Sequence, residues 1–298
     1  MPIKRKPYLL KNIAKHHLQQ MESIALKSDV AQNMFAMFYR SRLYSFIKDK
    51  IRRFQDLKLI DQIKKSKVPN HVAIIMDGNR RFAASTGLNP SLGHHFGTEK
   101  VKDTLDWCLD LGIKNLTLYA FSTENFNREQ GEVKELMDLC YTELSKAKKD
   151  SRLHKNRVKV SVIGQIDKLP SHIQEEANGL MNKTKKYDNY NLSIAIAYGG
   201  REEIVNAVQK IAEDVKCGEL DLMQINEEKV ASYLYTKDLP DPDLILRTSG
   251  EERISNFLLW QMAYSEFYFT DVYWPAFQKR DFLKAIKSYQ QRKRRYGN

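Results

Sequence analysis

The sequence predicts an α/β protein: a six-stranded, mostly parallel sheet covered by helices, with an N-terminal helical extension. After Pro69, short continuous apolar segments alternate with longer segments of helical periodicity, which is typical of a parallel sheet with helices on its faces. The length of 298 residues and the hydrophobic share of 42% also suffice to bury a sizeable core. We therefore expect one α/β domain preceded by a helical arm.

The arm comprises residues 1–67 and is strongly basic. It holds 16 Lys and Arg residues against 5 Asp and Glu, a net charge of +11 out of the +12 of the whole chain. From Phe35 to Ile63, apolar residues recur at helical spacing with basic residues between them, which predicts one or two amphipathic helices. Such a helix either packs on the globular body or lies on an anionic membrane surface. Val68-Pro69-Asn70 interrupts the pattern, so we place the domain boundary there, with residues 68–298 as the second domain.

Six short apolar segments are expected as strands of the body. In chain order they are Val72–Met76, Leu116–Phe121, Val158–Ile163, Leu192–Ala197, Leu244–Leu246 and Phe267–Val272. Segments with apolar residues three or four positions apart are expected as helices: Gly97–Leu111, Val133–Lys149, Ser171–Tyr187, Arg201–Val215 and Asp281–Arg295. Gly112 follows the first of these helices as a terminating glycine.

Arginine recurs in the loops that follow four of these strands. The loops are Asp77–Arg81, Ser122–Arg128, Tyr198–Arg201 and Arg247–Arg253. The carboxyl ends of parallel strands meet at one edge of a sheet, which is where such sheets bind ligands. Arginine side chains, small hydroxyls and the backbone N–H groups of glycines suit a polyphosphate, and a carboxylate such as Asp77 implies a bridging Mg²⁺. The edge is therefore predicted to bind one or two diphosphates with magnesium.

Several other classes of protein are excluded. The longest apolar runs are far below the roughly 20 residues that span a bilayer, and Lys11 and Lys15 stand where a signal peptide would need apolar residues. The body has no aromatic–basic interleaving of the kind that binds RNA, so we expect no nucleic-acid partner. Cys108, Cys140 and Cys217 have no CxxC spacing, which argues against a zinc or redox site. We expect a cytoplasmic protein, with peripheral membrane contact through the arm.

The residues of these loops also carry a resemblance. The segments His71–Phe82 with Gly93-His94, Leu118–Arg128, Ala197–Arg201, Leu246–Gln261 and Glu266–Pro275 resemble, in this order, motifs of the cis-prenyltransferases, the undecaprenyl and dehydrodolichyl diphosphate synthases. The resemblance covers about residues 68–297 and leaves only the arm outside. It implies an enzyme that condenses isopentenyl diphosphate with an allylic prenyl diphosphate, with Mg²⁺, and extends the chain by cis isoprene units. The polyprenyl diphosphate product would be a precursor of a glycosyl-carrier lipid.

The resemblance also implies roles for particular residues. Asp77 and Glu266 would hold Mg²⁺, and Asp77 and Asn125 would be catalytic, Asn125 either removing a proton or positioning a water or the released diphosphate. Substrate binding is implied for Gly78, Asn79, Arg80, Arg81, Phe82, His94, Ser122, Thr123, Glu124, Phe126, Arg128, Arg247, Arg253, Ile254, Ser255 and Gly297. Among these, Gly78 to Arg81, His94 and Arg128 match the allylic diphosphate site, and Arg247, Arg253 and Ser255 match the isopentenyl diphosphate site.

Five positions depart from the family's common pattern: Phe82 and Phe126 stand where Trp is frequent, and three others change charge relative to many bacterial members. Pro90 stands where those members have Arg, Arg80 where Gly is common, and Glu252 where some have His. Arg80 could replace the cation that is missing at Pro90. We therefore expect a primer length that differs from the bacterial pattern.

A prenyl product needs an apolar route away from the diphosphates. One helical face could line it, together with Leu105 and Ala120, although ordinary core packing is the other interpretation; that face carries Leu136, Met137, Cys140, Tyr141 and Leu144. The alternative function is that of a subunit in a heteromeric prenyltransferase, acting mainly through its partner. Arg295-Tyr296-Gly297 resembles a C-terminal motif that reaches a partner subunit's site, so a homodimer is expected and a heterodimer is the alternative.

Overall fold

The computed structural model describes residues 42–292, and the chain divides into two compact units, residues 1–59 and 60–298. Helix α3, Arg42–Lys64, crosses this division. Within the first unit, the side chains of Phe46, Phe54 and Leu57 on α3 are exposed. In the second unit, Ile63 near the end of α3 is completely buried, and Gln290 donates a hydrogen bond to its carbonyl oxygen at 2.8 Å. The predicted helical segment is thus confirmed from Arg42 onward, and its part before Arg42 lies outside the described residues.

The second unit is built on a six-stranded, all-parallel sheet in the order β3-β4-β2-β1-β5-β6. The strands are β1 (His71–Ile75), β2 (Asn115–Ser122), β3 (Val158–Ile163), β4 (Tyr190–Tyr198), β5 (Leu244–Arg247) and β6 (Glu266–Phe269). Residue Ile74 of β1 lies opposite Leu118 of β2 and Leu246 of β5, which fixes the register of the three central strands. All six predicted strands are confirmed, within a few residues at their ends.

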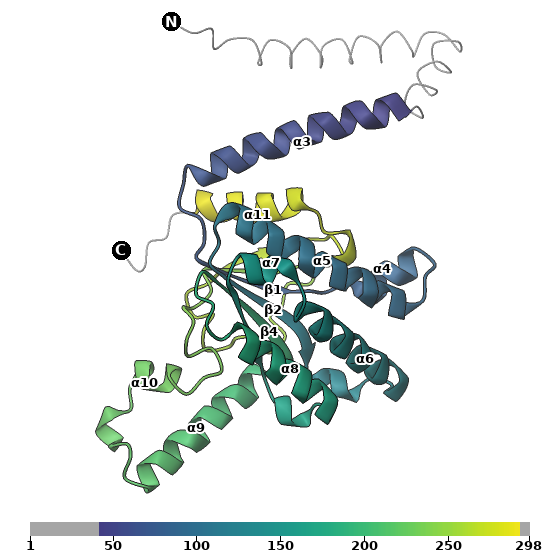
Figure 1. Cartoon of the computed structure of the whole chain (residues 1–298). Coiled ribbons are helices and arrows are strands. Elements are labelled where there is room, and N and C mark those ends of the chain that lie inside the picture. Colours follow the sequence, from purple (N-terminus) through teal and green to yellow (C-terminus); the bar gives the residue numbers. More distant parts are fainter. Residues whose placement is uncertain (1–41, 293–298) are drawn as a thin grey trace, which may run out of the picture. The chain divides into compact units, whose positions relative to one another are not determined.

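Helices surround this sheet (Figure 1). They are α4 (Asn79–Ser85), α5 (Pro90–Leu111), α6 (Gln130–Ala147), α7 (Ser151–Lys155), α8 (Ser171–Thr184), α9 (Gly200–Lys216), α10 (Glu227–Ala231) and α11 (Lys279–Gln291), with 3₁₀ turns η1 (Thr123–Asn127), η2 (Ile166–Lys168), η3 (Leu222–Gln224) and η4 (Trp274–Ala276). The five predicted helices of the body correspond to α5, α6, α8, α9 and α11. Gly112 ends α5 with a φ of 74°, as expected. None of the described helices is long and apolar enough to span a membrane.

The two faces of the sheet bury different groups. Leu118 of β2 and Ile194 of β4 point to a cavity shared with α5 and α6. Tyr119 of β2 points the other way, into a buried cluster with Phe257 and Leu258. The Tyr119 and Phe257 rings stack with their centroids 4.5 Å apart. Because side chains alternate along a strand, β2 packs against both layers.

Helix α4 and the first two turns of α5 were absent from the sequence prediction. Asn89 caps α5 by accepting a hydrogen bond from the Ser91 N–H, and Pro90 follows at the first position. Gly93 and Gly97 weaken the helical signal in this segment, but close packing requires them. A Cβ atom at Gly93 would lie 2.3 Å from the Asn79 carbonyl oxygen, and one at Gly97 would lie 2.5 Å from Asn79 Oδ1. The two glycines therefore let α5 cross directly beside the start of α4.

Candidate active site

The loops that follow β1 and β5 are locked together at the carboxyl edge of the sheet. The Asp77 N–H donates to Thr248 Oγ1 at 3.0 Å, and the Thr248 hydroxyl lies 2.7 Å from the Asp77 carbonyl oxygen. Gly78 then turns the chain with a φ of 102°, and a Cβ there would lie 2.8 Å from the Tyr273 ring. Only glycine meets both requirements, so the chain enters α4 with Asp77 held at the edge.

Asp77 lies between two arginines. Arg247 Nη2 donates to Asp77 Oδ2 at 2.8 Å, and Arg81 Nη2 lies 3.3 Å from Asp77 Oδ1. Burial alone would raise the pKa of Asp77, but the hydrogen bond and charge of Arg247, with the charge of Arg81, hold that pKa below its ordinary value. Asp77 is therefore ionised at neutral pH.

Arg81 continues this network to the loop after β5. Its guanidinium donates to Glu251 Oε1 at 2.8 Å and to Ser249 Oγ at 2.6 Å. Glu251 also pairs with Arg253, whose side chain is largely exposed. Arg247 contacts Ser255 Oγ at 2.8 Å, so Asp77, Arg81, Arg247, Arg253 and Ser255 form one connected group, as the sequence predicts.

A second group of charges adjoins the first through Arg80, the neighbour of Arg81. Glu132 on α6 gathers three groups: Arg128 at 2.8 Å, His94 Nε2 at 3.6 Å and Arg80 at 3.7 Å. Burial, with the nearby charge of Arg128, lowers the pKa of His94 despite Glu132, so this imidazole is neutral at pH 7. The structure thus brings together the three predicted residues, and it adds Glu132, which sequence reasoning missed.

Three buried polar atoms around these groups have no hydrogen-bond partner within residues 42–292: Asn79 Oδ1, His94 Nε2 and Arg247 Nε. Buried polar atoms are nearly always paired, with protein, water or a ligand. Asn79 and His94 also line the apolar cavity. Arg247 Nε is therefore a donor that an anionic ligand can use, whereas Asn79 Oδ1 is an acceptor that faces Gly97 and His94 Nε2 lies beside Glu132.

Asn256 connects the loops that follow β2 and β4. Its Nδ2 donates to Glu124 Oε1 at 2.9 Å, and its Oδ1 accepts from the Arg201 N–H at 2.9 Å. It holds a φ of 60°, between Ser255 at 49° and Leu258 at 46°. Sequence reasoning did not select Asn256, although it lies beside the predicted Ser255. The signal was its place inside a recognised motif.

Asn125 has a structural task in the same region. Its Oδ1 accepts a hydrogen bond from the Ser122 N–H at 3.0 Å, and Ser122 caps η1 in return. Thr123 begins this turn, and its Oγ1 would lie 2.8 Å from a Cβ atom at Gly199, so the turn lies close to the loop after β4.

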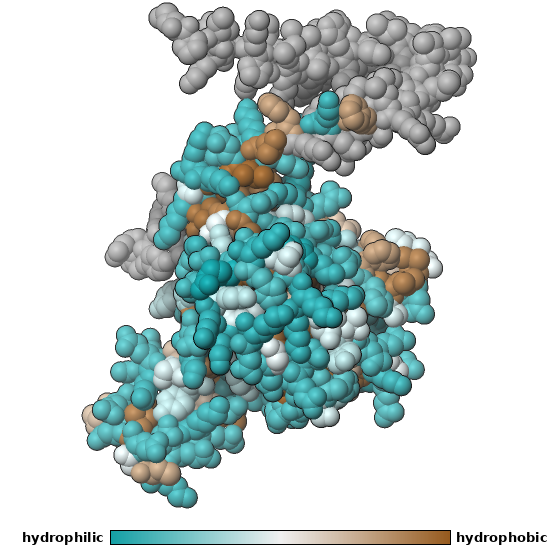
Figure 2. Space-filling view, viewed as in Figure 1, coloured by the Kyte–Doolittle hydropathy of each residue, from teal (hydrophilic) through white to brown (hydrophobic). Residues whose placement is uncertain are grey.

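The phenylalanines of the two loops pack against other rings. Phe126 packs edge-on against Phe121 with centroids 4.9 Å apart. Phe82 makes a similar contact with Phe96, whose side chain is exposed, as are those of Leu88 and Leu92. Figure 2 shows an apolar area on the side of the molecule where Figure 1 places α4.

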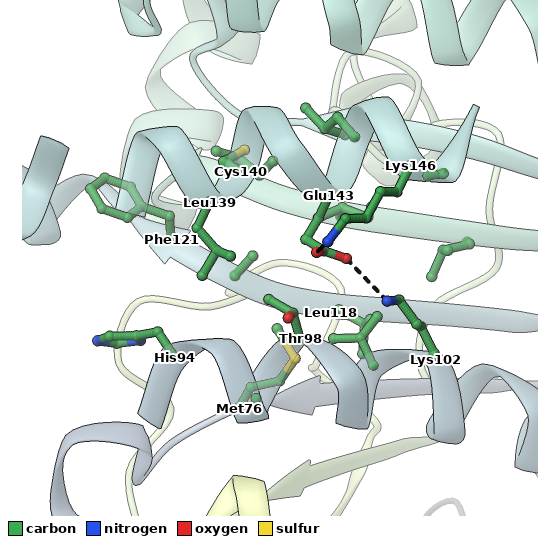
Figure 3. A pocket seen from close by; sticks show the side chains of 18 of the residues that line it. Met76, His94, Thr98, Lys102, Leu118, Phe121, Leu139, Cys140, Glu143 and Lys146 are labelled. Atoms are coloured by element: carbon green, nitrogen blue, oxygen red, sulfur yellow. Dashed lines mark hydrogen bonds and ion pairs between the residues drawn. The ribbon is translucent and has the colours of Figure 1, made fainter. Parts of the chain in front are cut away.

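The apolar cavity has a volume of about 210 Å³ and lies between α5, α6 and the sheet (Figure 3). Of the predicted lining residues, Leu105, Ala120, Leu136, Met137, Cys140 and Leu144 border it. Tyr141 does not: its ring is 39% exposed and packs against His172 instead. That prediction was wrong because the face of α6 that borders the cavity includes Cys140 and Leu144 but not Tyr141.

Within this chain, the structure does not bring together Glu266 and Asp77, the two residues predicted to hold Mg²⁺. Glu266 is the first residue of β6 and pairs with Leu244 of β5, which in turn pairs with Val72 of β1. Glu266 therefore lies at the same height in the sheet as Val72, near the start of β1. Asp77 lies five residues further along, which is about 16 Å at the rise of a strand. The carboxylate of Glu266 instead pairs with Arg292 at 2.5 Å.

Two further predicted substrate-binding residues remain. Ile254 is half-buried in the loop after β5, and Gly297 lies outside the described residues.

Asp77 is the one predicted magnesium ligand that lies at the carboxyl edge of the sheet in this chain. Within residues 42–292 there is no cluster of three or more His, Cys, Asp or Glu side chains that could cage a metal. Mg²⁺, however, usually binds one or two carboxylates and takes its other ligands from water and substrate phosphates. The single ionised carboxylate of Asp77 is partly exposed and lies beside two arginines, which fits a metal that arrives with a diphosphate.

This chain is similar to known proteins over most of its length. The model of a family described as "Putative undecaprenyl diphosphate synthase" matches residues 75–297. A tritrans,polycis-undecaprenyl-diphosphate synthase (geranylgeranyl-diphosphate specific) from Picrophilus torridus is 51% identical over 247 residues, covering 83% of this chain and 97% of the relative. A protein of the same name from Methanocaldococcus jannaschii is 51% identical over 241 residues, covering 80% and 86%.

Two solved structures extend the comparison. Lavandulyl diphosphate synthase from Lavandula x intermedia, in complex with dimethylallyl diphosphate, superposes with a TM-score of 0.75 at 39% identity, covering 78% of this chain and 99% of that one. A probable undecaprenyl diphosphate synthase from Campylobacter jejuni gives a TM-score of 0.64 at 33% identity, covering 78% and 100%.

Proposed function

This chain belongs to the undecaprenyl diphosphate synthase family of cis-prenyltransferases and elongates prenyl diphosphates, and from that premise we propose its substrates and the roles of its residues. The primer is geranylgeranyl diphosphate, and the product is a polyprenyl diphosphate of the undecaprenyl class, the precursor of a glycosyl-carrier lipid. The printed names of the two relatives support this choice of primer. Arg80, in a position where bacterial members commonly have Gly, supports a primer different from theirs.

One observation carries the assignment of the site. Two groups of arginines, with a buried donor at Arg247 Nε that has no hydrogen-bond partner among the described residues, lie near Asn79 and His94, which border an apolar cavity. A polar head with an apolar tail satisfies both halves of this arrangement. A prenyl diphosphate is such a molecule.

The allylic diphosphate is proposed to bind Gly78, Asn79, Arg80, Arg81, His94 and Arg128. Its negative charge would attract Arg80 and Arg128 away from Glu132 and would favour protonation of His94. Cleavage of the allylic C–O bond leaves further charge on this diphosphate. The arginines that are already in place stabilise that charge more in the transition state than in the ground state.

Isopentenyl diphosphate is proposed to bind Arg247, Arg253 and Ser255, on the other side of Asp77. Arg247 is 4% exposed and fixed by its contacts with Asp77 and Ser255, so it is preorganised for an anion. Asn125 is proposed to position the group that takes the proton, since its own Oδ1 already accepts the Ser122 N–H. Ser122, Glu124 and Phe126 complete this side of the site.

Magnesium is proposed as the cofactor, with Asp77 as the protein ligand in this chain. Bound there, the ion would neutralise charge on the departing diphosphate. Asp77 contributes an ionised carboxylate, because Arg247 and Arg81 keep its pKa low. Removal of divalent ions with EDTA should abolish turnover, and addition of Mg²⁺ should restore it.

A homodimer and peripheral contact with an anionic membrane are further parts of the proposal. Arg295-Tyr296-Gly297 supports a site completed by a second copy. The exposed Phe46, Phe54 and Leu57 on a helix that also carries basic residues support contact with a lipid surface, at the cytoplasmic side. The heteromeric alternative has less support, because Asp77, Arg81, Asn125, Arg247 and Arg253 are all present in this chain.

A primer panel tests the proposed function. Purified protein is incubated with labelled isopentenyl diphosphate, Mg²⁺ and one primer in turn: dimethylallyl, geranyl, farnesyl or geranylgeranyl diphosphate. Geranylgeranyl diphosphate should give the highest kcat/KM for label entering a butanol-extractable product. A preference for a shorter primer would contradict the choice of primer, and no product with any primer would contradict the activity itself.

A further inference from the structure

The helical hairpin formed by α4, α5 and the turn between them carries apolar side chains on its surface. Leu88 in the turn, and Leu92 and Phe96 on α5, are 36%, 43% and 48% exposed. Leu92 and Phe96 are four residues apart and therefore lie on one face of α5. Figure 1 shows this turn at an outer edge of the second unit, on the side where Figure 2 shows an apolar area. We call Leu88, Leu92 and Phe96 the hairpin patch.

The sequence around the hairpin patch contains no charged residue. The 17 residues from Phe82 to Thr98 include no Lys, Arg, Asp or Glu, in a chain of which these residues make up 29%. Within this segment, every residue from Ala84 to Pro90 is exposed. Transfer of a charged side chain out of water is costly, whereas transfer of an apolar one is favourable. The hairpin can therefore leave water without removing a charge from it.

Exposure alone does not distinguish this patch. Leu222 and Met223 in η3 are more exposed, at 68% and 91%, but they directly follow the exposed carboxylate of Asp221. Val205 on α9 is 56% exposed and lies one turn from Glu202. The hairpin patch differs from both because its own segment is uncharged.

A polar pocket of about 270 Å³ lies directly beside the hairpin patch. The hairpin residues Asn89, Pro90 and Ser91 line it, together with Arg80 and His94. The Arg80 side chain is 60% exposed, so the pocket reaches the surface. Arg80 and His94 belong to the proposed site of the allylic diphosphate. A surface that covers the hairpin patch therefore comes next to the residues that would bind this head group.

The size of the hairpin patch favours a lipid surface over a protein partner. A large apolar side chain presents about 150–250 Å², so the exposed parts of Leu88, Leu92 and Phe96 amount to on the order of 250 Å². A stable protein interface takes about 800 Å² from each partner. The patch is too small for such an interface, but each of its side chains gains free energy by itself on entering the apolar boundary of a bilayer.

We propose that the hairpin patch inserts into the surface of a lipid bilayer and holds the site beside it. This inference rests on the proposed function, because the lipid is argued partly from the prenyl diphosphates that the site would bind. A polyprenyl product would then pass from the site to the bilayer without crossing water. The contact is apolar, so it differs from that of the basic arm: it needs no anionic lipid and it persists at high salt.

The test measures sedimentation of the full chain with vesicles of phosphatidylcholine alone, in about 0.5 M NaCl, where a Debye length of about 4 Å screens the attraction of the arm. The double variant Leu88→Gln with Leu92→Gln should lower the partition coefficient by at least about tenfold. The matched control, Leu222→Gln with Met223→Gln, removes two more exposed apolar side chains and should bind as the wild type does. Equal binding of the hairpin variant and the wild type, or an equal loss in the control, would overturn the proposal.

A second measurement keeps the hairpin apolar, in case the double variant does not fold. The fluorescence of Leu92→Trp should shift to shorter wavelength when these vesicles are added, and that of Met223→Trp should not; no shift at position 92 would overturn the proposal. Conversion of a dimer to a monomer in the double variant, seen by gel filtration without vesicles, would assign the patch to contact between copies and would also overturn it. Vesicle binding is measured without substrates, so a failure of the proposed activity is detected separately, by the primer panel.

Discussion

Arg247 Nη2 donates a hydrogen bond to Asp77 Oδ2 at 2.8 Å and thereby joins residues that are 170 positions apart in the chain. The Arg247 side chain is 4% exposed, and its Nε has no hydrogen-bond partner among the described residues. A buried guanidinium with one unused donor is held in place before any ligand arrives. The pair therefore fixes both the charge state of Asp77 and the position of a cation for a diphosphate.

Arg247→Lys should lower kcat/KM for isopentenyl diphosphate by about 100-fold, because a lysine cannot bridge Asp77 and Ser255 as the planar guanidinium does. The pKa of Asp77 should rise once the Arg247 hydrogen bond is lost, so the acidic limb of the pH–rate profile should move to higher pH. Initial rates across pH measure both effects. Arg157→Lys, at an exposed pair with Asp188, is the matched control, and an unmoved acidic limb would contradict the coupling.

Buried His71 should make stability fall in acid. Burial lowers its pKa from 6.5 to about 4, and its ring nitrogens lie 2.6 Å from the Pro240 carbonyl oxygen and 2.8 Å from Thr117 Oγ1. The unfolded chain therefore binds this proton at a higher pH than the native chain, so native stability is complete above pH 6.5 and decreases as the pH falls toward 4. The free energy of unfolding should drop by about 2 kcal/mol from pH 8 to pH 5 through this residue. Urea unfolding of His71→Asn should give a flatter pH dependence, and parallel curves would refute the assignment.

Two N-terminal truncations should differ in stability. Removal of residues 1–59 leaves Ile63 in place, whereas removal of residues 1–67 deletes this fully buried side chain and the carbonyl that accepts from Gln290. The longer deletion should therefore cost about 2–5 kcal/mol more, as for large core truncations. Urea unfolding compares the two proteins, and equal stability would count against a boundary near residue 59.

The shorter deletion also tests the role of the arm. Loss of residues 1–59 should weaken binding to anionic vesicles while turnover in detergent stays at the level of the full chain. Sedimentation with vesicles containing anionic lipid measures the binding, with neutral vesicles as the control. Unchanged binding to anionic vesicles would contradict membrane contact through the arm.

Asn256 should matter for activity although it carries no charge. Asn256→Ala removes the contacts to Glu124 and the Arg201 N–H and places alanine at a φ of 60°. Displacement of these loops should lower kcat/KM by about tenfold to 100-fold. Asn256→Gly should be about 1 kcal/mol more stable than Asn256→Ala, because glycine accepts the left-handed conformation. Chemical denaturation of both variants checks this, and the reverse order of stability would contradict the backbone argument.

The sheet, and the meeting of the loops that follow its strands, could be predicted from sequence because both depend on local patterns. Buried parallel strands are continuous apolar runs, and the loops after them meet at one edge whatever the details of packing. Helix α4 could not be predicted in this way, since it has only seven residues and depends on the close approach of Gly93 and Gly97 to Asn79. Tyr141 was misplaced because a helical stripe does not say where its inward face ends.

Residues that act by holding others were the hardest to find. Glu132 is defined by the three-dimensional convergence of Arg80, His94 and Arg128, which has no one-dimensional signature. Asn256 lies inside a recognised motif, but its contacts to the loops after β2 and β4 appear only in the folded chain. Glu266 was predicted as a magnesium ligand from its motif, but the motif does not show that strand register places it near the amino edge of this chain's sheet, away from Asp77. The register of β6 against β5 depends on how the whole sheet assembles, so it cannot be predicted from the sequence of one chain.

The most direct test of the proposed site is the turnover of Asp77→Asn beside that of Asp103→Asn. Asp103 is an exposed carboxylate on α5 that pairs with Lys100, so the two variants change the same chemical group in different places. With geranylgeranyl diphosphate, labelled isopentenyl diphosphate and Mg²⁺, Asp77→Asn should lose at least about 100-fold in kcat and Asp103→Asn should match the wild type. Wild-type turnover in Asp77→Asn would contradict the proposed site at the carboxyl edge of the sheet.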